Sequence, residues 1–315
     1  MNNRRSFIVG IKSTKLSSKE KTFIKKYKPW GIILFTRNIK SINQTLKLTS
    51  SIRKIFNDKK YPILIDQEGG RINRLKNIIS FGNLSSEFFG NKYIKNFKEF
   101  NFFYKLFIDK TSYLLKSIGV NINTVPVLDL RLKGSSNVIG DRSFSKDPKI
   151  VSKIGDYCIQ YFHENGIGTV IKHVPGHGLA KVDSHHFTPK VNKKQSFLSK
   201  KDFIAFKKKK SFFAMTAHII FSKIDKKNTV THSKRLIKLI RNKIGFKNIL
   251  ISDDLSMKSL KGSVKENTIK TFNAGCNLAL HCNGVFKEME IVGKNSPLIN
   301  KFIFKKTSQF YKILS

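Results

Sequence analysis

The sequence predicts an α/β protein built as a single-domain (β/α)8 TIM-type barrel, and three observations support this fold class. Short apolar runs rich in β-branched residues alternate with longer segments of helical period, about eight times over. Polar clusters follow five consecutive runs, at the strand ends where barrel enzymes build their sites. No repeat, linker or low-complexity break divides the chain, so we expect residues 1–315 to form one domain.

The expected elements follow from this alternation. Within 148–165, apolar residues including Val151, Ile154 and Cys158 recur on one face, and Gly166 follows as a helix stop. The runner-up is a doubly wound open sheet, but the first strand-to-helix turn lacks the G-x-G-x-x-G sequence. The expected strands are 7–11, 31–35, 63–66, 120–124, 169–171, 213–217, 249–252 and 278–280. The expected helices are 18–27, 42–56, 96–118, 148–165, 200–209, 233–243 and 264–274, with a closing helix in 297–315.

Composition narrows the class of protein. The formal net charge is +41, but the lysines are spread over nearly every segment and no nucleic-acid-binding motif accompanies them. We therefore expect non-specific sticking to nucleic acid at low salt rather than a specific nucleic-acid function. Three scattered cysteines indicate reduced core thiols, and no apolar run reaches the length of a signal peptide core or a membrane span. A cytoplasmic protein, monomeric and with no membrane partner, is the expectation.

The stretch 171–189, IKHVPGHGLAKVDSHHFTP, has the composition of a working loop. Asp183 precedes His185 by two residues, and a carboxylate that holds an imidazole fixes its tautomer and raises its pKa, so a proton-transfer device is one interpretation. A polar loop whose histidines only satisfy backbone groups is another. A metal site is the third, although neither H-x-x-x-H nor H-E-x-x-H is present. Its ligands would be His173, His177, Asp183, His185 and His186.

Two adjacent carboxylates end the seventh expected strand. Because side chains alternate along a strand, Asp253 can point into the barrel mouth while Asp254 caps a helix beginning near Leu255. A carboxylate nucleophile beside a proton donor is the arrangement of retaining glycoside hydrolysis. No second carboxylic acid stands at a matching position, but the Asp183 and His185 pair can supply and recover the proton.

Several motifs in this order resemble those of bacterial β-N-acetylhexosaminidases of glycoside hydrolase family 3, the NagZ type. They are GIILFTRNI at 31–39, ILIDQEGGRINR at 63–74, GDRSFSKDP at 140–148, KHVPGHGLAKVDSHHFTP at 172–189, MTAHIIF at 215–221 and SDDLSM at 252–257. The resemblance implies a barrel enzyme that removes terminal N-acetylglucosamine from peptidoglycan fragments carrying anhydro-muramic acid. It also implies a cytoplasmic location and no metal or other cofactor.

The same resemblance assigns roles to individual residues. It makes Asp253 the nucleophile, His185 the general acid/base and Asp183 the partner that orients His185. The sugar-binding positions of the family fall on Asp66, Arg74, Arg142, Lys172 and His173.

The chain departs from the family pattern at several points. Val174 replaces a more usual Phe, His186 follows the catalytic imidazole, and residues 277–281 lack the Asp expected after the Gly-Cys pair. The expected consequences concern fine specificity and the rim at the eighth strand, and His186 could compete for Asp183. Two other functions stay open: a sugar-binding protein that has lost turnover, and a basic nucleic-acid-binding protein on the same scaffold.

Overall fold

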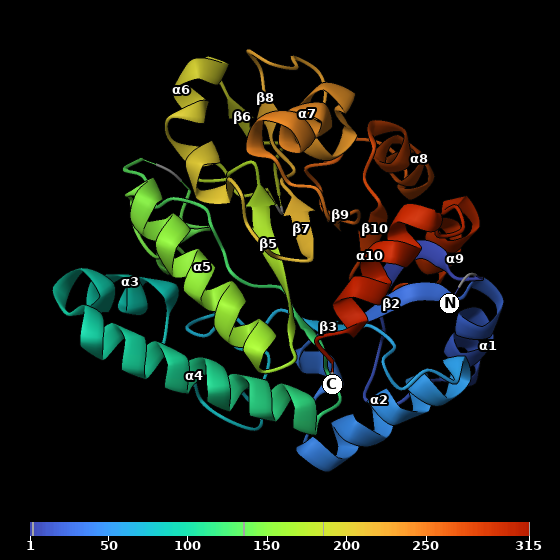
Figure 1. Cartoon of the computed structure of the whole chain (residues 1–315). Coiled ribbons are helices and arrows are strands. Elements are labelled where there is room, and N and C mark those ends of the chain that lie inside the picture. The colour runs from blue at the N-terminus through green and yellow to red at the C-terminus, as the bar shows by residue number, and fades with distance from the viewer. Residues whose placement is uncertain (2, 135, 185, 315) are drawn as a thin grey trace.

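The computed structural model describes residues 1–315 except 2, 135, 185 and 315, and in this part of the chain eight parallel strands close into a barrel (Figure 1). Each strand pairs with its neighbours in chain order, and β10 closes the ring against β1. The (β/α)8 prediction is therefore confirmed, and the open sheet is excluded. The barrel strands are β1 (Arg5–Gly10), β2 (Pro29–Leu34), β3 (Ile63–Ile65), β4 (Ile122–Asn123), β5 (Gly168–Val174), β7 (Phe213–Thr216), β9 (Ile249–Asp254) and β10 (Leu278–His281).

The sequences of the barrel strands explain why these strands are buried on both faces. Runs such as ILI in β3 and PWGIIL in β2 are apolar on both faces, as strands covered by helices outside and packed side chains inside must be.

The expected fifth strand is wrong in length, because β5 continues to Val174. Lys172 and His173 thus lie within its last three residues and not after its end. The peptide bonds Lys172–His173 and Val174–Pro175 are cis.

Five of the expected helices agree with the structure to within one residue at each end. They are α1 (Ser18–Tyr27), α2 (Ile42–Phe56), α4 (Phe97–Ser117), α5 (Pro148–Glu164) and α8 (Val264–Ala274). Local capping explains the precision, because Ser17 with Glu20 and Ser263 with Glu266 form capping boxes at the starts of α1 and α8.

Other helices differ from the prediction. The expected helix 200–209 is wrong: a short α6 (Gln195–Ser199) is followed by a 3-10 turn at Asp202–Phe206, which puts Phe203 and Phe206 three residues apart and buries both. The expected helix 233–243 divides into α7 (Lys234–Leu239) and a π-helical turn at Ile240–Ile244. The prediction missed α3 (Ser86–Lys95) and α9 (Phe286–Asn295).

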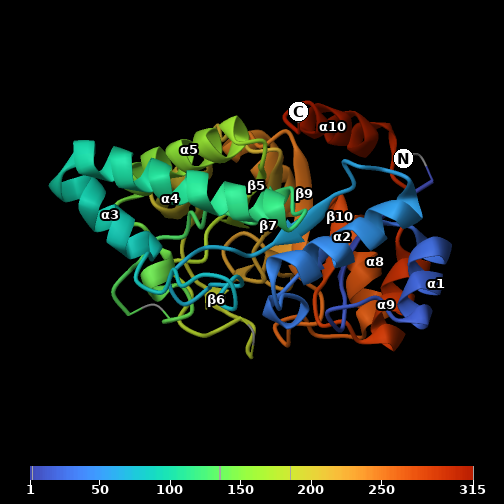
Figure 2. The ribbon, with the colours of Figure 1, turned by 90° about the horizontal axis from the view of Figure 1, so that it is seen from below.

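The closing helix lies across the amino-terminal end of the barrel. Within the expected range 297–315, α10 spans Lys301–Tyr311. Trp30 of β2 donates its indole N–H to the Thr307 hydroxyl at 2.9 Å, and the Phe310 ring packs on Phe213 with centroids 5.3 Å apart. Figure 2 shows α10 at one end of the molecule and β6 at the other. Helix α10 therefore acts as a plug that closes the amino-terminal end of the barrel, and the carboxyl ends of the strands stay accessible for a site.

A second, two-stranded sheet lies beyond the carboxyl end of the barrel. Its strands β6 (Lys190–Val191) and β8 (Ile220–Phe221) pair in parallel. β6 follows the loop after β5 and β8 follows the end of β7, so this sheet joins two loops of the site-bearing face. Among the described helices, none combines the length and apolar character needed to cross a membrane.

Candidate active site

A cavity opens at the carboxyl ends of the barrel strands, where the sequence predicts a site. Its side chains come from the ends of β5, β7, β9 and β10 and from the loops after β3, β4 and β5. Six of the residues predicted from the sequence meet there: Asp66, Arg74, Arg142, Lys172, His173 and Asp253. The cavity is also lined by Glu68, Ile72, Val138, Ile139, His177, Ser184, Met215, Leu280 and Cys282.

Lys172 forms the centre of a buried charge cluster on one wall. Its ammonium lies 2.6 Å from a Glu68 oxygen and 3.1 Å from an Asp66 oxygen, and it donates to the Thr124 hydroxyl at 3.0 Å. Asp66 also accepts a hydrogen bond from Thr124 and lies 3.5 Å from Arg74. Burial acts to raise the pKa of Asp66, but Lys172 and Arg74 outweigh it and hold that pKa well below its ordinary value.

Arg142 completes the cluster from the loop after β4. Its guanidinium donates two hydrogen bonds to the Glu68 carboxylate, at 2.8 and 2.9 Å. Burial acts to raise the pKa of Glu68, yet Arg142 and Lys172 lower it to about 2. Both Asp66 and Glu68 are therefore ionised at neutral pH. They can accept hydrogen bonds from sugar hydroxyls, but neither can donate a proton to a leaving group.

Asp129 organises the two histidines of the cavity, and the sequence reasoning missed it. Its carboxylate lies 2.7 Å from Nδ1 of His173 and accepts the backbone N–H of His177 at 2.6 Å. The residue is fully buried within the run VLDL after the fourth strand. The sequence signal for Asp129 is a single carboxylate within an apolar run, because a buried charge needs a partner. The signal for Glu68 is the polar sequence DQE directly after the third strand.

The loop after β5 is tied to the cavity through His177. Its Nε2 lies 3.0 Å from the Ser184 hydroxyl, and burial lowers the pKa of His177 to about 4, so this imidazole is neutral. Asp183 is partly exposed and does not line the cavity, while its backbone carbonyl accepts N–H donors from His186 and Phe187. His185, the predicted acid/base, lies outside the described residues.

Asp253 and Asp254 have different surroundings. Asp253 lines the cavity, and its Oδ1 accepts the backbone N–H of Asp254 at 2.8 Å, which orients the carboxylate. The prediction that Asp254 caps a helix near Leu255 is wrong, because residues 255–260 form turns and α8 begins only at Val264. Asp254 instead accepts the backbone N–H groups of Ser256 at 3.1 Å and Cys282 at 3.0 Å. It thereby fastens the end of β9 to the end of β10.

Two further histidines near the carboxyl ends of the strands make structural contacts. Buried His218 contacts the Thr231 hydroxyl through Nδ1 at 2.7 Å and the Asp254 carbonyl through Nε2 at 3.0 Å. His281, in the segment where the family pattern is altered, is buried with Nε2 2.8 Å from Glu288. Over the part of the chain that the structure describes, no group of three or more His, Cys, Asp or Glu side chains is arranged to hold a metal ion.

Known proteins resemble this chain over most of its length. The model of the glycosyl hydrolase family 3 N terminal domain matches residues 6–297. A β-hexosaminidase of Nitrosomonas eutropha is 33% identical over 265 residues, which cover 80% of this chain and 73% of that protein. A β-hexosaminidase of Tolumonas auensis is 30% identical over 286 residues, covering 88% and 82%.

Solved structures show the same likeness. NagZ from Neisseria gonorrhoeae, in complex with N-trifluoroacetyl-D-glucosamine, superposes with a TM-score of 0.87 at 26% identity and covers 98% of this chain and 90% of that one. A glycoside hydrolase family 3 β-N-acetylglucosaminidase from Paenibacillus sp. superposes with a TM-score of 0.85 at 25% identity. This chain spans 60% of the length of the Paenibacillus protein and is itself covered over 98%.

Proposed function

Because the chain belongs to the NagZ-type β-N-acetylhexosaminidases of glycosyl hydrolase family 3, we propose that it is a retaining exo-β-N-acetylglucosaminidase that works through a glycosyl ester on Asp253. The observation that carries the proposal is the position of Asp253, which lines the cavity from the end of β9 with its carboxylate oriented by the backbone N–H of Asp254. The other cavity carboxylates, Asp66 and Glu68, form ion pairs with Lys172 and Arg142 and belong to the charge cluster that binds the sugar.

In the first step, a carboxylate oxygen of Asp253 attacks the anomeric carbon while the bond to the leaving oxygen breaks. His185, protonated and oriented by Asp183, gives its proton to that oxygen. In the second step, His185 takes a proton from water, whose oxygen attacks the anomeric carbon and breaks the ester. An imidazole fits this part because the two other cavity carboxylates stay ionised and cannot act as the acid.

The charge cluster supplies the binding of the sugar. Asp66 can accept hydrogen bonds from two neighbouring hydroxyls, while Arg74, Arg142, Lys172 and His173 provide donors for hydroxyl and acyl oxygens. The natural substrates we propose are peptidoglycan fragments, N-acetylglucosamine linked to anhydro-N-acetylmuramic acid with or without peptide. They would be cleaved in the cytoplasm during cell-wall recycling, by a monomeric single-domain enzyme that needs no metal.

The nucleophile is tested by trapping the intermediate. A slow-turnover fluorinated N-acetylglucosaminide should leave a covalent label on the peptide containing Asp253, and mass spectrometry locates it. Asp254 is the internal control, since its oxygens are occupied by Ser256 and Cys282. A label on Asp254, or no label from a substrate that the enzyme cleaves, would refute the assignment.

The acid is tested by varying the leaving group. His185→Ala should lose activity severely, by about 100-fold or more, on a natural disaccharide whose leaving oxygen needs a proton. The loss should be small on a nitrophenyl glycoside, because nitrophenolate departs as a stable anion. Asp183→Asn should show the same pattern more mildly, since it keeps the imidazole. Equal losses of kcat/KM on both substrates would mean that His185 binds the sugar instead.

A further inference from the structure

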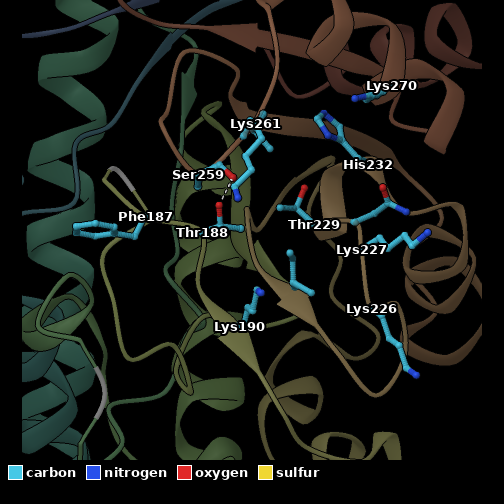
Figure 3. Close-up of a pocket in the computed structure, with 13 residues that line it drawn as sticks. Phe187, Thr188, Lys190, Lys226, Lys227, Thr229, His232, Ser259, Lys261 and Lys270 are labelled. Carbon is cyan, nitrogen blue, oxygen red and sulfur yellow. Dashed lines mark hydrogen bonds between the residues drawn. The ribbon is translucent and has the colours of Figure 1, made fainter.

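A second cavity, of about 530 Å³, lies beside the catalytic loop and has no part in the proposed chemistry. Three segments build it: 187–190, which continues the loop carrying Asp183, then 220–232, which follows β7, and 259–270, which follows β9. Thr188 donates its hydroxyl to the Ser259 carbonyl at 2.8 Å, so the first and third segments are joined at the cavity wall. Figure 3 shows this contact at the centre of the cavity.

The lining of this second cavity carries positive charge only. Figure 3 shows Lys190 and Lys261 reaching toward its centre from opposite sides, with Lys226 and Lys227 on the rim. All thirteen lining residues are described and none is Asp or Glu, and none of the lining lysines forms an ion pair with a described carboxylate. The ionisable lining residues are Lys190, Lys226, Lys227, His232, Lys261 and Lys270.

Polar atoms without partners accompany the lysines. Thr229 and Ser259 are buried, with 5% and 1% of their surface exposed. Within the described part of the chain, their hydroxyls have no hydrogen-bond partner, and Nε2 of His232 has none either. Buried polar groups normally find a partner, because an unmade hydrogen bond costs about 1–3 kcal/mol. Burial, His218 and Lys270 together lower the pKa of His232 to about 4, so its ring is neutral at neutral pH.

The second cavity lies on the side of the active site where the leaving-group sugar is expected. Ser184 lines the active-site cavity and Thr188 lines the second one, so both cavities take a residue from the same short sequence segment, 184–188. This segment carries the proposed acid, and a general acid stands on the leaving-group side of the scissile bond. A chain attached to the leaving sugar would therefore leave the active-site cavity near Ser184 and enter the second cavity near Thr188.

We propose that this cavity is a subsite for the carboxylates of an acidic acyl or peptide chain attached to the leaving-group sugar. Lys190 and Lys261 bind the carboxylates, and the Thr229, Ser259 and His232 side chains hydrogen-bond the chain after small rotations. The inference rests on the proposed glycosidase function and deepens it. It makes this lysine cavity a determinant of selectivity between substrates that share the same sugar.

The test compares two disaccharide substrates that differ only in the leaving-group chain, one with free carboxylates and one with the same chain amidated. The wild-type enzyme should prefer the anionic substrate in kcat/KM by about threefold to tenfold, the range expected for two solvent-exposed charge pairs. The double variant Lys190→Gln/Lys261→Gln should abolish this preference. The matched control, Lys98→Gln/Lys105→Gln on the outer helix α4, removes the same charge and should retain the preference.

A nitrophenyl N-acetylglucosaminide tests the glycosidase function separately from the subsite. All variants should cleave it at the wild-type rate, and failure of the wild-type enzyme to cleave it would refute the proposed function itself. If that substrate is cleaved but the anionic chain gives no preference, or both double variants lose it equally, the subsite is refuted alone.

A binding experiment distinguishes the source of the anion. The His232 ring resonances, assigned with His232→Gln, should shift on addition of a free acidic tripeptide to the full-length protein. Inorganic phosphate at equal ionic strength should cause a smaller shift. Shifts with phosphate only would identify a phosphate site and overturn the subsite, as would the absence of any shift.

Discussion

Asp202 is a buried carboxyl group that the proposed reaction does not use. It lies 1% exposed beneath the turn after β5, so close to Gly176 that a Cβ on that glycine would come within 2.6 Å of the Asp202 Cβ. Burial, helped by the charge of Asp129, raises the pKa of Asp202 from 3.8 to about 7. The folded protein therefore holds this proton more tightly than the unfolded chain does.

The resulting prediction concerns stability as a function of pH. A raised carboxyl pKa contributes stability that is complete below pH 3.8 and is lost as the pH rises through about 7. Asp202→Asn removes this dependence, so the variant should gain about 1–3 kcal/mol on the wild type between pH 4.5 and pH 8. Urea unfolding at three pH values measures the gain. A difference between the two proteins that stays constant with pH would contradict the prediction.

The sequence indicates which polar residues reach the site but not how they are paired. Asp253 and Lys172 could be anticipated because they stand at strand ends in motifs, and the cavity contains both. The pairing of Glu68 with Arg142, and of Asp129 with His173, joins residues 44 to 74 positions apart. Such pairs depend on which loops meet over the barrel, and spacing along one chain does not encode that.

Among the elements, α3 makes the most restrictive contact with the site loops. A Cβ on Gly90 would lie 1.7 Å from the carbonyl oxygen of Phe144, two residues after Arg142. Gly90→Ala should therefore push the helix away from this loop, costing about 2–4 kcal/mol of stability and weakening substrate binding through Arg142. Thermal unfolding and KM for the nitrophenyl glycoside measure the two effects.

Gly82→Ala is the matched control for this helix contact. Its nearest neighbour, the Ser80 hydroxyl, lies 3.9 Å from the position of the new Cβ, so stability and KM should stay at wild-type values. If Gly90→Ala is as harmless as the control, close contact between Gly90 and the Phe144 carbonyl does not hold α3 against the loop 140–144.

The elements also show where periodicity is informative. Each barrel strand overlaps an expected strand, and five helices agree with the prediction to within one residue at each end, because their signals are local, as in the Ser17 and Glu20 box of α1. The segment 200–209 was not predicted well, because burial of Phe203 and Phe206 under the site loop imposes a tighter turn than its helical pattern suggests. The helix α3 was missed since its sequence SEFFGNKYIK has a glycine in its middle and only a weak apolar stripe.

For the whole molecule the dominant quantity is the net charge of +41. Like charges spread over one surface repel and destabilise the compact state, and salt screens them within about 10 Å at 0.1 M. Raising NaCl from 20 to 300 mM should therefore raise Tm by about 2–6 °C. Calorimetry measures the shift, with kcat on the neutral nitrophenyl glycoside as the control that salt should leave unchanged. A falling Tm would mean that attractive ion pairs outweigh the repulsion.

The plug at the amino-terminal end of the barrel has an optical consequence. Trp30 is the chain's single tryptophan, and its indole N–H is bound to Thr307 of α10. The fluorophore thus reports on the seating of the last helix, a barrel length away from the sugar. Emission should shift to the red when α10 detaches, even if the active site is still intact. Sugar binding should leave the Trp30 emission unchanged. Intrinsic fluorescence is therefore suited to measuring unfolding, and ligand binding has to be measured with an external probe.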